Sequence, residues 1–257
     1  MYFEILAGIL LPLLGTTLGA SCVFFMKKSL NHRVKEAICG FAGGVMIAAS
    51  IWSLIIPAIE HESSLALGVF SFIPALCGLW LGIAFLILTD RLIPEPSLDT
   101  PLSTLRENRM LILSVSLHNL PEGMAVGVMY AVMLSSGNFE DISAAFALSL
   151  GIAVQNFPEG AIVSMPLASD GMSRPRAFLY GFLSGVIEPL GAALTLLTLS
   201  FVFPLLPYLL GFAAGAMIYA VMKELTPIIN KDENSNMGVI FFALGFSFMM
   251  TLDVALG

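Results

Sequence analysis

The strings HNLPEG (118–123) and QNFPEG (155–160) place the same polar motif inside two long apolar segments. The first lies in LILSVSLHNLPEGMAVGVMYAVML (111–134) and the second in ISAAFALSLGIAVQNFPEGAIVSMPLA (142–168). Each segment exceeds the roughly 20 apolar residues that a helix needs to cross a bilayer. The sequence therefore predicts two membrane-spanning helices that carry charged and amide side chains near their middles.

The composition of the whole chain agrees with this prediction. An ordinary soluble domain has about 25% charged residues, whereas this chain of 257 residues has 11% charged and 58% hydrophobic residues. We therefore expect an all-α, polytopic membrane protein with a single domain (1–257), and not a soluble enzyme, a secreted disulfide scaffold or a nucleic-acid-binding protein. Hydropathy predicts eight spans, at about 3–26, 37–59, 65–89, 110–134, 142–168, 177–203, 205–223 and 237–256.

The basic residues alternate between the connections. All 11 Lys and Arg residues follow the first, third and fifth spans, or lie at the end of the seventh span and in the loop after it. Cytoplasmic loops carry an excess of Lys and Arg. The distribution predicts a multi-pass inner-membrane protein with both termini outside the cytoplasm.

Two internal repeats run in opposite directions across the predicted membrane. GFAGGVMIAA (40–49) in the second span and GFAAGAMIYA (211–220) in the seventh are identical at seven of ten positions. HNLPEG and QNFPEG lie in the fourth and fifth spans, which are also antiparallel. Inverted-topology repeats are typical of secondary transporters, whose substrates bind near the midplane between the repeats.

Four ionisable residues lie deep in the predicted spans: His118, Glu122, Glu159 and Glu188. No Lys or Arg lies deep in a span to pair with them. A buried carboxylate without a partner is costly, so it needs a proton or a cation. Three such carboxylates predict a bound cation, a proton load or both.

The spacing of the two motifs favours a metal cation. His118 and Glu122 are four residues apart and share a helix face, as do Gln155 and Glu159. Asn119 and Asn156 lie about 100° further round their helices, beside a second position that Glu122 and Glu159 could bridge to the first. Nitrogen, carboxylate and amide ligands suit zinc, iron or manganese. The alternative is that these polar side chains join helices by hydrogen bonds.

A line of residues at helical spacing runs along the second span: Met46, Ser50, Ser53, Pro57 and Glu60. Ser53 and Glu60 are candidates for a route outward. The spacing alone favours a packing role for Met46, with a thioether ligand as the alternative.

The two motifs, with Glu188 in the next span, resemble those of the ZIP (Zrt-/Irt-like) metal transporters, most of all the GufA-like prokaryotic branch. The resemblance implies import of divalent metal, chiefly zinc, with Fe²⁺, Mn²⁺, Co²⁺ or Cd²⁺ in some members, and no organic cofactor. It makes Met46 a ligand, and it makes Ser53 and Glu60 pathway residues. It assigns one metal position to Met46, His118, Glu122, Gln155 and Glu159, and a second to Asn119, Glu122, Asn156, Glu159 and Glu188.

The sequence predicts a binuclear midplane site and alternating access, with divalent metal ions and the lipid bilayer as partners. An intramembrane zinc-dependent metalloenzyme is the alternative from another class, because a His/Glu zinc site can activate water. A proton-coupled carrier of organic solutes is disfavoured by the lack of an embedded arginine. The sequence leaves the oligomeric state open, with a homodimer as one option.

Overall fold

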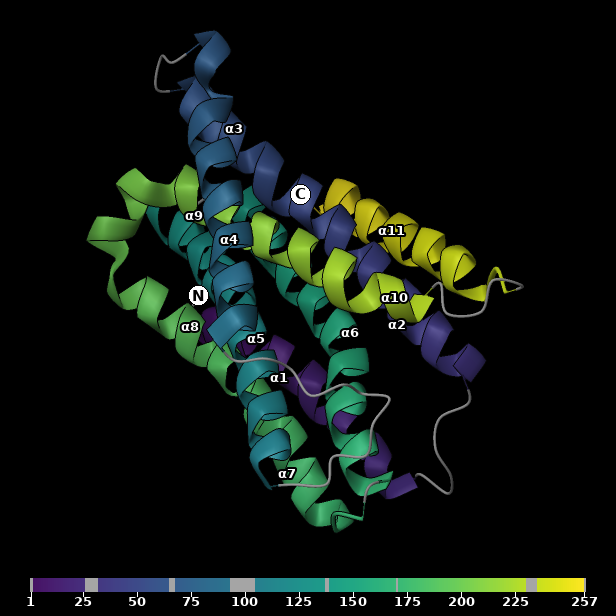
Figure 1. Ribbon diagram of the computed structural model, residues 1–257. Helices are drawn as coiled ribbons and strands as arrows, with labels where there is room; N and C mark the ends of the chain where they lie inside the picture. Colours follow the sequence, from purple (N-terminus) through teal and green to yellow (C-terminus); the bar gives the residue numbers. More distant parts are fainter. Residues whose placement is uncertain are drawn as a thin grey trace.

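The computed structural model describes residues 2–25, 32–64, 68–92, 105–136, 139–169, 171–229 and 235–256. Every regular element in these residues is helical, and the long helices form one bundle (Figure 1). The helices are α1 (Tyr2–Phe25), α2 (His32–Ala49), η1 (Ser50–Ile55), α3 (Ile56–Ser64), η2 (Gly68–Phe70), α4 (Phe72–Leu92), α5 (Leu105–Ser136), α6 (Phe139–Ser169), α7 (Arg174–Gly185), α8 (Ile187–Leu197), α9 (Leu199–Ala220), η3 (Val221–Leu225), α10 (Thr226–Ile229) and α11 (Met237–Leu256).

Seven helical stretches in the described residues are long and apolar enough to cross a membrane. They match seven of the eight predicted spans, and the remaining span lies in the motif helix α5. That helix has 32 residues, which exceeds the roughly 20 that a crossing requires. The prediction of an all-α, polytopic membrane protein is confirmed.

Some predicted boundaries are wrong. The sixth span was expected to reach residue 203, but α8 ends at Leu197 and α9 begins at Leu199. Thr198 makes this turn with a non-helical backbone (φ −102°, ψ 25°), and its N–H donates to the carbonyl oxygens of Leu194 and Thr195, each at 3.2 Å. Hydropathy missed the turn because the residues on both sides of it are apolar. The third long helix starts at Phe72, later than the predicted 65.

The second and seventh spans each contain a π-helical turn. The turn η1 begins at Ser50, directly after the repeated string at 40–49, and η3 begins at Val221, directly after the string at 211–220. The equal placement shows that the two strings share their local conformation as well as their residues. Short π-helical segments are rare and are often found at functional sites.

The helix packing follows the inverted repeats. The two most extensive contacts of the bundle pair α1 with α6 and α2 with α11, and the next two pair α4 with α9 and α5 with α8. Exchanging α1 with α8, α2 with α9, α4 with α11 and α5 with α6 converts each pair into another of the four. In Figure 1, α2 and α9 run in opposite directions along the bundle, as an inverted repeat requires.

Close backbone contacts show which residues of the two repeats correspond to each other. A Cβ atom added to Gly40 of α2 would collide with the carbonyl oxygen of Gly238 in α11, and one added to Gly211 of α9 would collide with that of Ala75 in α4. Gly40 and Gly211 are the first residues of the two repeated strings. Glycine lets both helix pairs approach to backbone contact, as small residues commonly do in membrane bundles.

Large apolar side chains are exposed on the outer helices, where lipid would cover them. The clearest examples are Leu14 and Leu18 of α1 and Trp80 and Leu81 of α4, with exposed fractions between 51% and 64%. The ends of α1 and α6 and the starts of α5 and α7 lie together at the lower end of the bundle in Figure 1. The sequence segments that follow or begin there carry most of the basic residues.

Candidate metal site

The polar motif residues lie inside the bundle, where α5, α6 and α8 meet. Asn119 and Glu122 of α5, Gln155 and Asn156 of α6, and Glu188 of α8 are at most 3% exposed. Both motif helices continue through their prolines, so α5 and α6 each present the motif on an unbroken helix. Burial of this many polar groups requires partners for them.

Two hydrogen bonds connect the three helices. The amide nitrogen Nε2 of Gln155 donates to Oε1 of Glu122 at 2.8 Å, which joins the two motifs. The amide nitrogen Nδ2 of Asn119 donates to Oε1 of Glu188 at 3.1 Å, which joins α5 to α8. Glu159 is half-buried and lies close enough to Glu188 to interact with it electrostatically. The structure therefore gathers carboxylates from three spans.

Several buried atoms in this cluster have no hydrogen-bond partner among the described residues. They are Oδ1 of Asn119, Oε1 of Gln155, both amide atoms of Asn156 and Oε2 of Glu188. Buried polar side-chain atoms usually have a partner, so each exception needs an explanation. All but one of these atoms are oxygens, which are the atoms that a metal cation would bind.

Met46 is a predicted ligand that the structure does not bring to the cluster, and His118 is one whose position there is not described. His118 belongs to α5, but its side chain lies outside the described part of the structure. Met46 of α2 is 2% exposed and packs in the apolar core, and no described contact joins its sulfur to the carboxylates. Cys39, two turns earlier on the same helix face, lies within electrostatic reach of Glu159.

The described side chains do not form a ready-made metal site. No group of three or more His, Cys, Asp or Glu side chains among them is close enough to hold an ion. The carboxylate of Glu122 is instead hydrogen-bonded to Gln155, and that of Glu188 to Asn119 and Thr16. Binding of one ion by Glu122 of α5 and Glu188 of α8 together would require these hydrogen bonds to rearrange.

The predicted pathway residue Ser53 lies in η1 and is 4% exposed. Its hydroxyl donates to Oδ1 of Asp253 in α11 at 2.6 Å. The other predicted pathway residue, Glu60, is exposed in α3. Asp253 was not among the residues predicted from the sequence, although it is an acidic residue in the last apolar segment.

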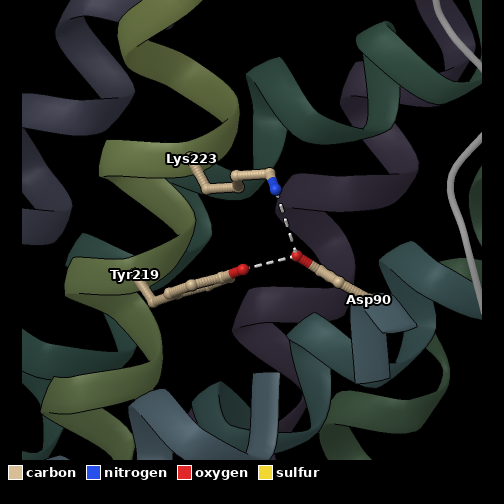
Figure 2. Close-up of polar contacts among 3 residues, drawn as sticks. All are labelled: Asp90, Tyr219 and Lys223. Carbon is tan, nitrogen blue, oxygen red and sulfur yellow. Dashed lines mark hydrogen bonds and ion pairs between the residues drawn. The ribbon is translucent and has the colours of Figure 1, made fainter. Parts of the chain in front are cut away.

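A second acidic residue, Asp90, occupies the end of α4 (Figure 2). The hydroxyl of Tyr219 in α9 donates to Oδ2 of Asp90 at 2.6 Å. The ammonium group Nζ of Lys223 in η3 lies 3.8 Å from the same oxygen. This cluster was not predicted from the sequence, in which Lys223 counted only as one of the basic residues at the end of the seventh span.

Asp90 and Asp253 are equivalent positions in the two repeats. A Cβ atom on Gly82 would collide with the carbonyl oxygen of Phe212, and one on Gly245 with that of Phe41, the matching residue of the other repeated string. Asp90 follows Gly82 by eight residues, and Asp253 follows Gly245 by eight. Each aspartate therefore contacts the second helix of the opposite repeat, beside or within its π-helical turn.

These features define the chain as a polytopic α-helical membrane protein built from inverted repeats. The model of the Zip family, described as ZIP Zinc transporter, matches residues 101–253. The chain is similar to zinc transporter ZIP11 of Xenopus tropicalis (33% identical, covering 100% of this chain and 99% of the relative). It is also similar to zinc transporter ZIPB of Bordetella bronchiseptica (34% identical, 94% and 78% covered) and to zinc transporter GufA of Myxococcus xanthus (31% identical, 98% and 99% covered).

The chain belongs to the ZIP family, in its GufA-like branch. Members of this family are named as zinc transporters, so the chain is a transporter of divalent metal and not an enzyme. The resemblance drawn from the two polar motifs is confirmed, and the metalloenzyme alternative is wrong.

Proposed function

We propose that this protein imports divalent metal, with zinc as the main substrate, through a buried site between α5, α6 and α8. The observation that carries the proposal is the pair of buried carboxylates, Glu122 and Glu188, each joined to an amide of a neighbouring motif residue. The sequence supplies no Lys or Arg in segments 110–134, 142–168 and 177–203. A cation from solution is therefore the natural partner for these carboxylates.

The site takes the metal in two adjacent positions. Met46, His118, Gln155, Glu122 and Glu159 serve the first position, and Asn119, Asn156, Glu188 and the two bridging glutamates serve the second. The open oxygens of Asn119, Gln155 and Glu188 support this assignment. Fe²⁺, Mn²⁺, Co²⁺ and Cd²⁺ are candidate substrates beside zinc, because the same nitrogen and oxygen ligands accept them.

The metal reaches the site by alternating access. The contact between Ser53 and Asp253 closes the end of the route that faces outward, and the contact of Asp90 with Tyr219 and Lys223 closes the cytoplasmic end. The two closures lie at equivalent positions of inverted repeats, and such repeats exchange roles as a transporter rocks. With the end near Asp90 in the cytoplasm, both termini lie on the outer side of the inner membrane. The distribution of the basic residues agrees with this orientation.

Uptake by proteoliposomes tests this function. Purified protein should carry zinc into vesicles with saturable kinetics and with no other substrate added. Glu122→Ala should reduce uptake to the level of protein-free vesicles, because it removes a bridging carboxylate. The matched control is Glu4→Ala, which removes an exposed carboxylate at the start of α1 and should leave uptake unchanged. Wild-type uptake no greater than that of empty vesicles would overturn the proposal, as would normal uptake by Glu122→Ala.

A further inference from the structure

Thr16, in the middle of α1, contacts the proposed site from a helix that supplies no predicted ligand. The side chains of Thr16 and Glu188 are each 1% exposed. The hydroxyl Oγ1 of Thr16 donates to Oε1 of Glu188 at 2.9 Å, and it lies 3.4 Å from the carbonyl oxygen of Pro12. The shorter distance makes the glutamate the main acceptor of this proton.

Among the described residues Oε1 of Glu188 has two donors, while the amide of Asn156 lies near the carboxylate without hydrogen-bond geometry to Oε2. Asn119 donates to the same Oε1 at 3.1 Å, and its amide also donates to the carbonyl oxygen of Ser184 at 3.1 Å. Oε2 is buried and lacks a hydrogen-bond partner in the described structure. Two donors on one oxygen fix the rotation of the carboxylate and leave the other oxygen available for a cation.

The inverted repeat makes Thr16 the counterpart of Glu188. A Cβ atom on Gly160, the last residue of QNFPEG, would collide with the carbonyl oxygen of Thr16. A Cβ atom on Gly123, the last residue of HNLPEG, would collide with the carbonyl oxygen of Glu188. Thr16 and Glu188 thus occupy the same place against the two motif helices.

A second pair of contacts three residues away confirms this register. Gly19 packs against the carbonyl oxygen of Phe157, and Gly191 packs against that of Leu120. Phe157 and Leu120 hold the same position in the two motifs. Thr16 and Glu188, which are equivalent in the two repeats, therefore contact each other. Glu188 contributes a carboxylate and Thr16 a hydroxyl donor.

We propose that Thr16 is a positioning residue for metal, which orients Glu188 so that its Oε2 faces the second metal position. This inference rests on the proposed function. Without the hydroxyl, Asn119 alone would hold Oε1, and the carboxylate would lose part of its preferred orientation. Residues that orient metal ligands typically contribute about 10- to 100-fold to metal affinity.

Three variants separate the hydroxyl from the shape of the side chain. Thr16→Val removes the hydroxyl and keeps the volume, while Thr16→Ser keeps the hydroxyl and loses the methyl group. Thr17→Val is the matched control, because the hydroxyl of Thr17 donates to the carbonyl oxygen of Leu13 at 2.6 Å and not to the site. Zinc titration of the purified proteins, with the number of ions bound measured by mass spectrometry, gives the two affinities.

Thr16→Val should weaken the second zinc by about 10- to 100-fold and leave the first unchanged. Thr16→Ser and Thr17→Val should bind both ions as the wild type does. Thr16→Ala is a second hydroxyl-free variant, and it should behave as Thr16→Val does. Melting temperatures identify which variants are folded.

Normal affinity for both ions in a folded hydroxyl-free variant would overturn the inference and leave the proposed function standing. Impaired binding by Thr16→Ser with normal binding by Thr16→Val would also overturn it, because that result would show a packing role. A wild-type protein that binds no zinc would overturn both the proposed function and this inference.

Discussion

Glu122 and Glu188 are both buried, but they have different surroundings. Glu122 accepts from Gln155 of the neighbouring motif helix, whereas Glu188 accepts from Asn119 and from Thr16 of α1. In the proposed site Glu122 bridges two ions and Glu188 binds only the second. The two glutamates should therefore differ in what their removal costs.

Glu122→Ala should abolish zinc binding at both positions, because each ion loses a ligand. Glu188→Ala should remove the second ion and leave the first. The measurement is the number of zinc ions bound per chain after equilibration with zinc, with melting temperature as a check on folding. Loss of both ions in a folded Glu188→Ala protein would contradict the division into two positions.

Asp90→Asn should slow zinc transport while leaving bound zinc unchanged, because Asp90 lies at the end of α4 and not in the cluster of motif residues. The matched control is Thr89→Ala, whose hydroxyl donates to the carbonyl oxygen of Phe85 within the same helix at 3.0 Å. Initial uptake rates and equilibrium zinc binding together test the prediction. Unchanged rates, or the loss of bound zinc, would show that the closure at Asp90 has another role.

At the scale of residues, the sequence predicted those groups whose chemistry is unusual for a membrane span. Glu122, Glu159 and Glu188 stood out because a charge in a span is costly. Thr16 did not stand out, because the hydroxyl of a threonine in a span ordinarily donates to a carbonyl oxygen of its own helix. Its role depends on a partner 172 positions away, and only the packing of α1 reveals it.

At the scale of helices, the glycines of α2 determine how closely this helix approaches α11. A Cβ atom on Gly44 would collide with the backbone of Phe242, whereas one on Gly43 would make only ordinary contacts, the nearest at 3.5 Å. The other repeated string has Ala214 at the position that corresponds to Gly43. The two adjacent glycines thus serve different purposes.

Gly44→Ala should destabilise the folded protein by about 1–3 kcal/mol, the usual cost of overpacking. Gly43→Ala should be neutral or slightly stabilising, because alanine favours a helix by about 1 kcal/mol over glycine. Thermal unfolding of the purified proteins measures both effects. Equal melting temperatures for the two variants would show that the contact between α2 and α11 is not as close as described.

The sequence predicted the helices and their repeats but not their irregularities. The strings at 40–49 and 211–220 revealed the repeats through their identical residues. The π-helical turns that follow them could not be predicted, because the residues of η1 and η3, SIWSLI and VMKEL, share no common pattern. The turn at Thr198 was missed for a similar reason, since apolar residues on both sides of it leave no mark in a hydropathy average.

At the scale of the whole molecule, the two repeats have the same arrangement. The four extensive helix contacts form two equivalent sets, and Asp90 and Asp253 occupy equivalent positions at opposite ends. Ser53 lies beside Asp253 at one end, and Met222, which is 62% exposed, precedes Lys223, the η3 residue that contacts Asp90, at the other. Alternating access requires that these two ends open in different states of the transporter. It also requires that Ser53 is reached from outside and Met222 from the cytoplasm.

Labelling of single cysteines with a membrane-impermeant maleimide tests this claim most directly. Ser53→Cys and Met222→Cys are made separately in a chain in which Cys22, Cys39 and Cys77 are replaced, and labelling rates are measured with and without zinc. We expect Ser53→Cys to react only from outside and Met222→Cys only from inside, and we expect zinc to change the two rates in opposite directions. Labelling of Met222→Cys from outside, or a change of both rates in the same direction, would contradict this claim.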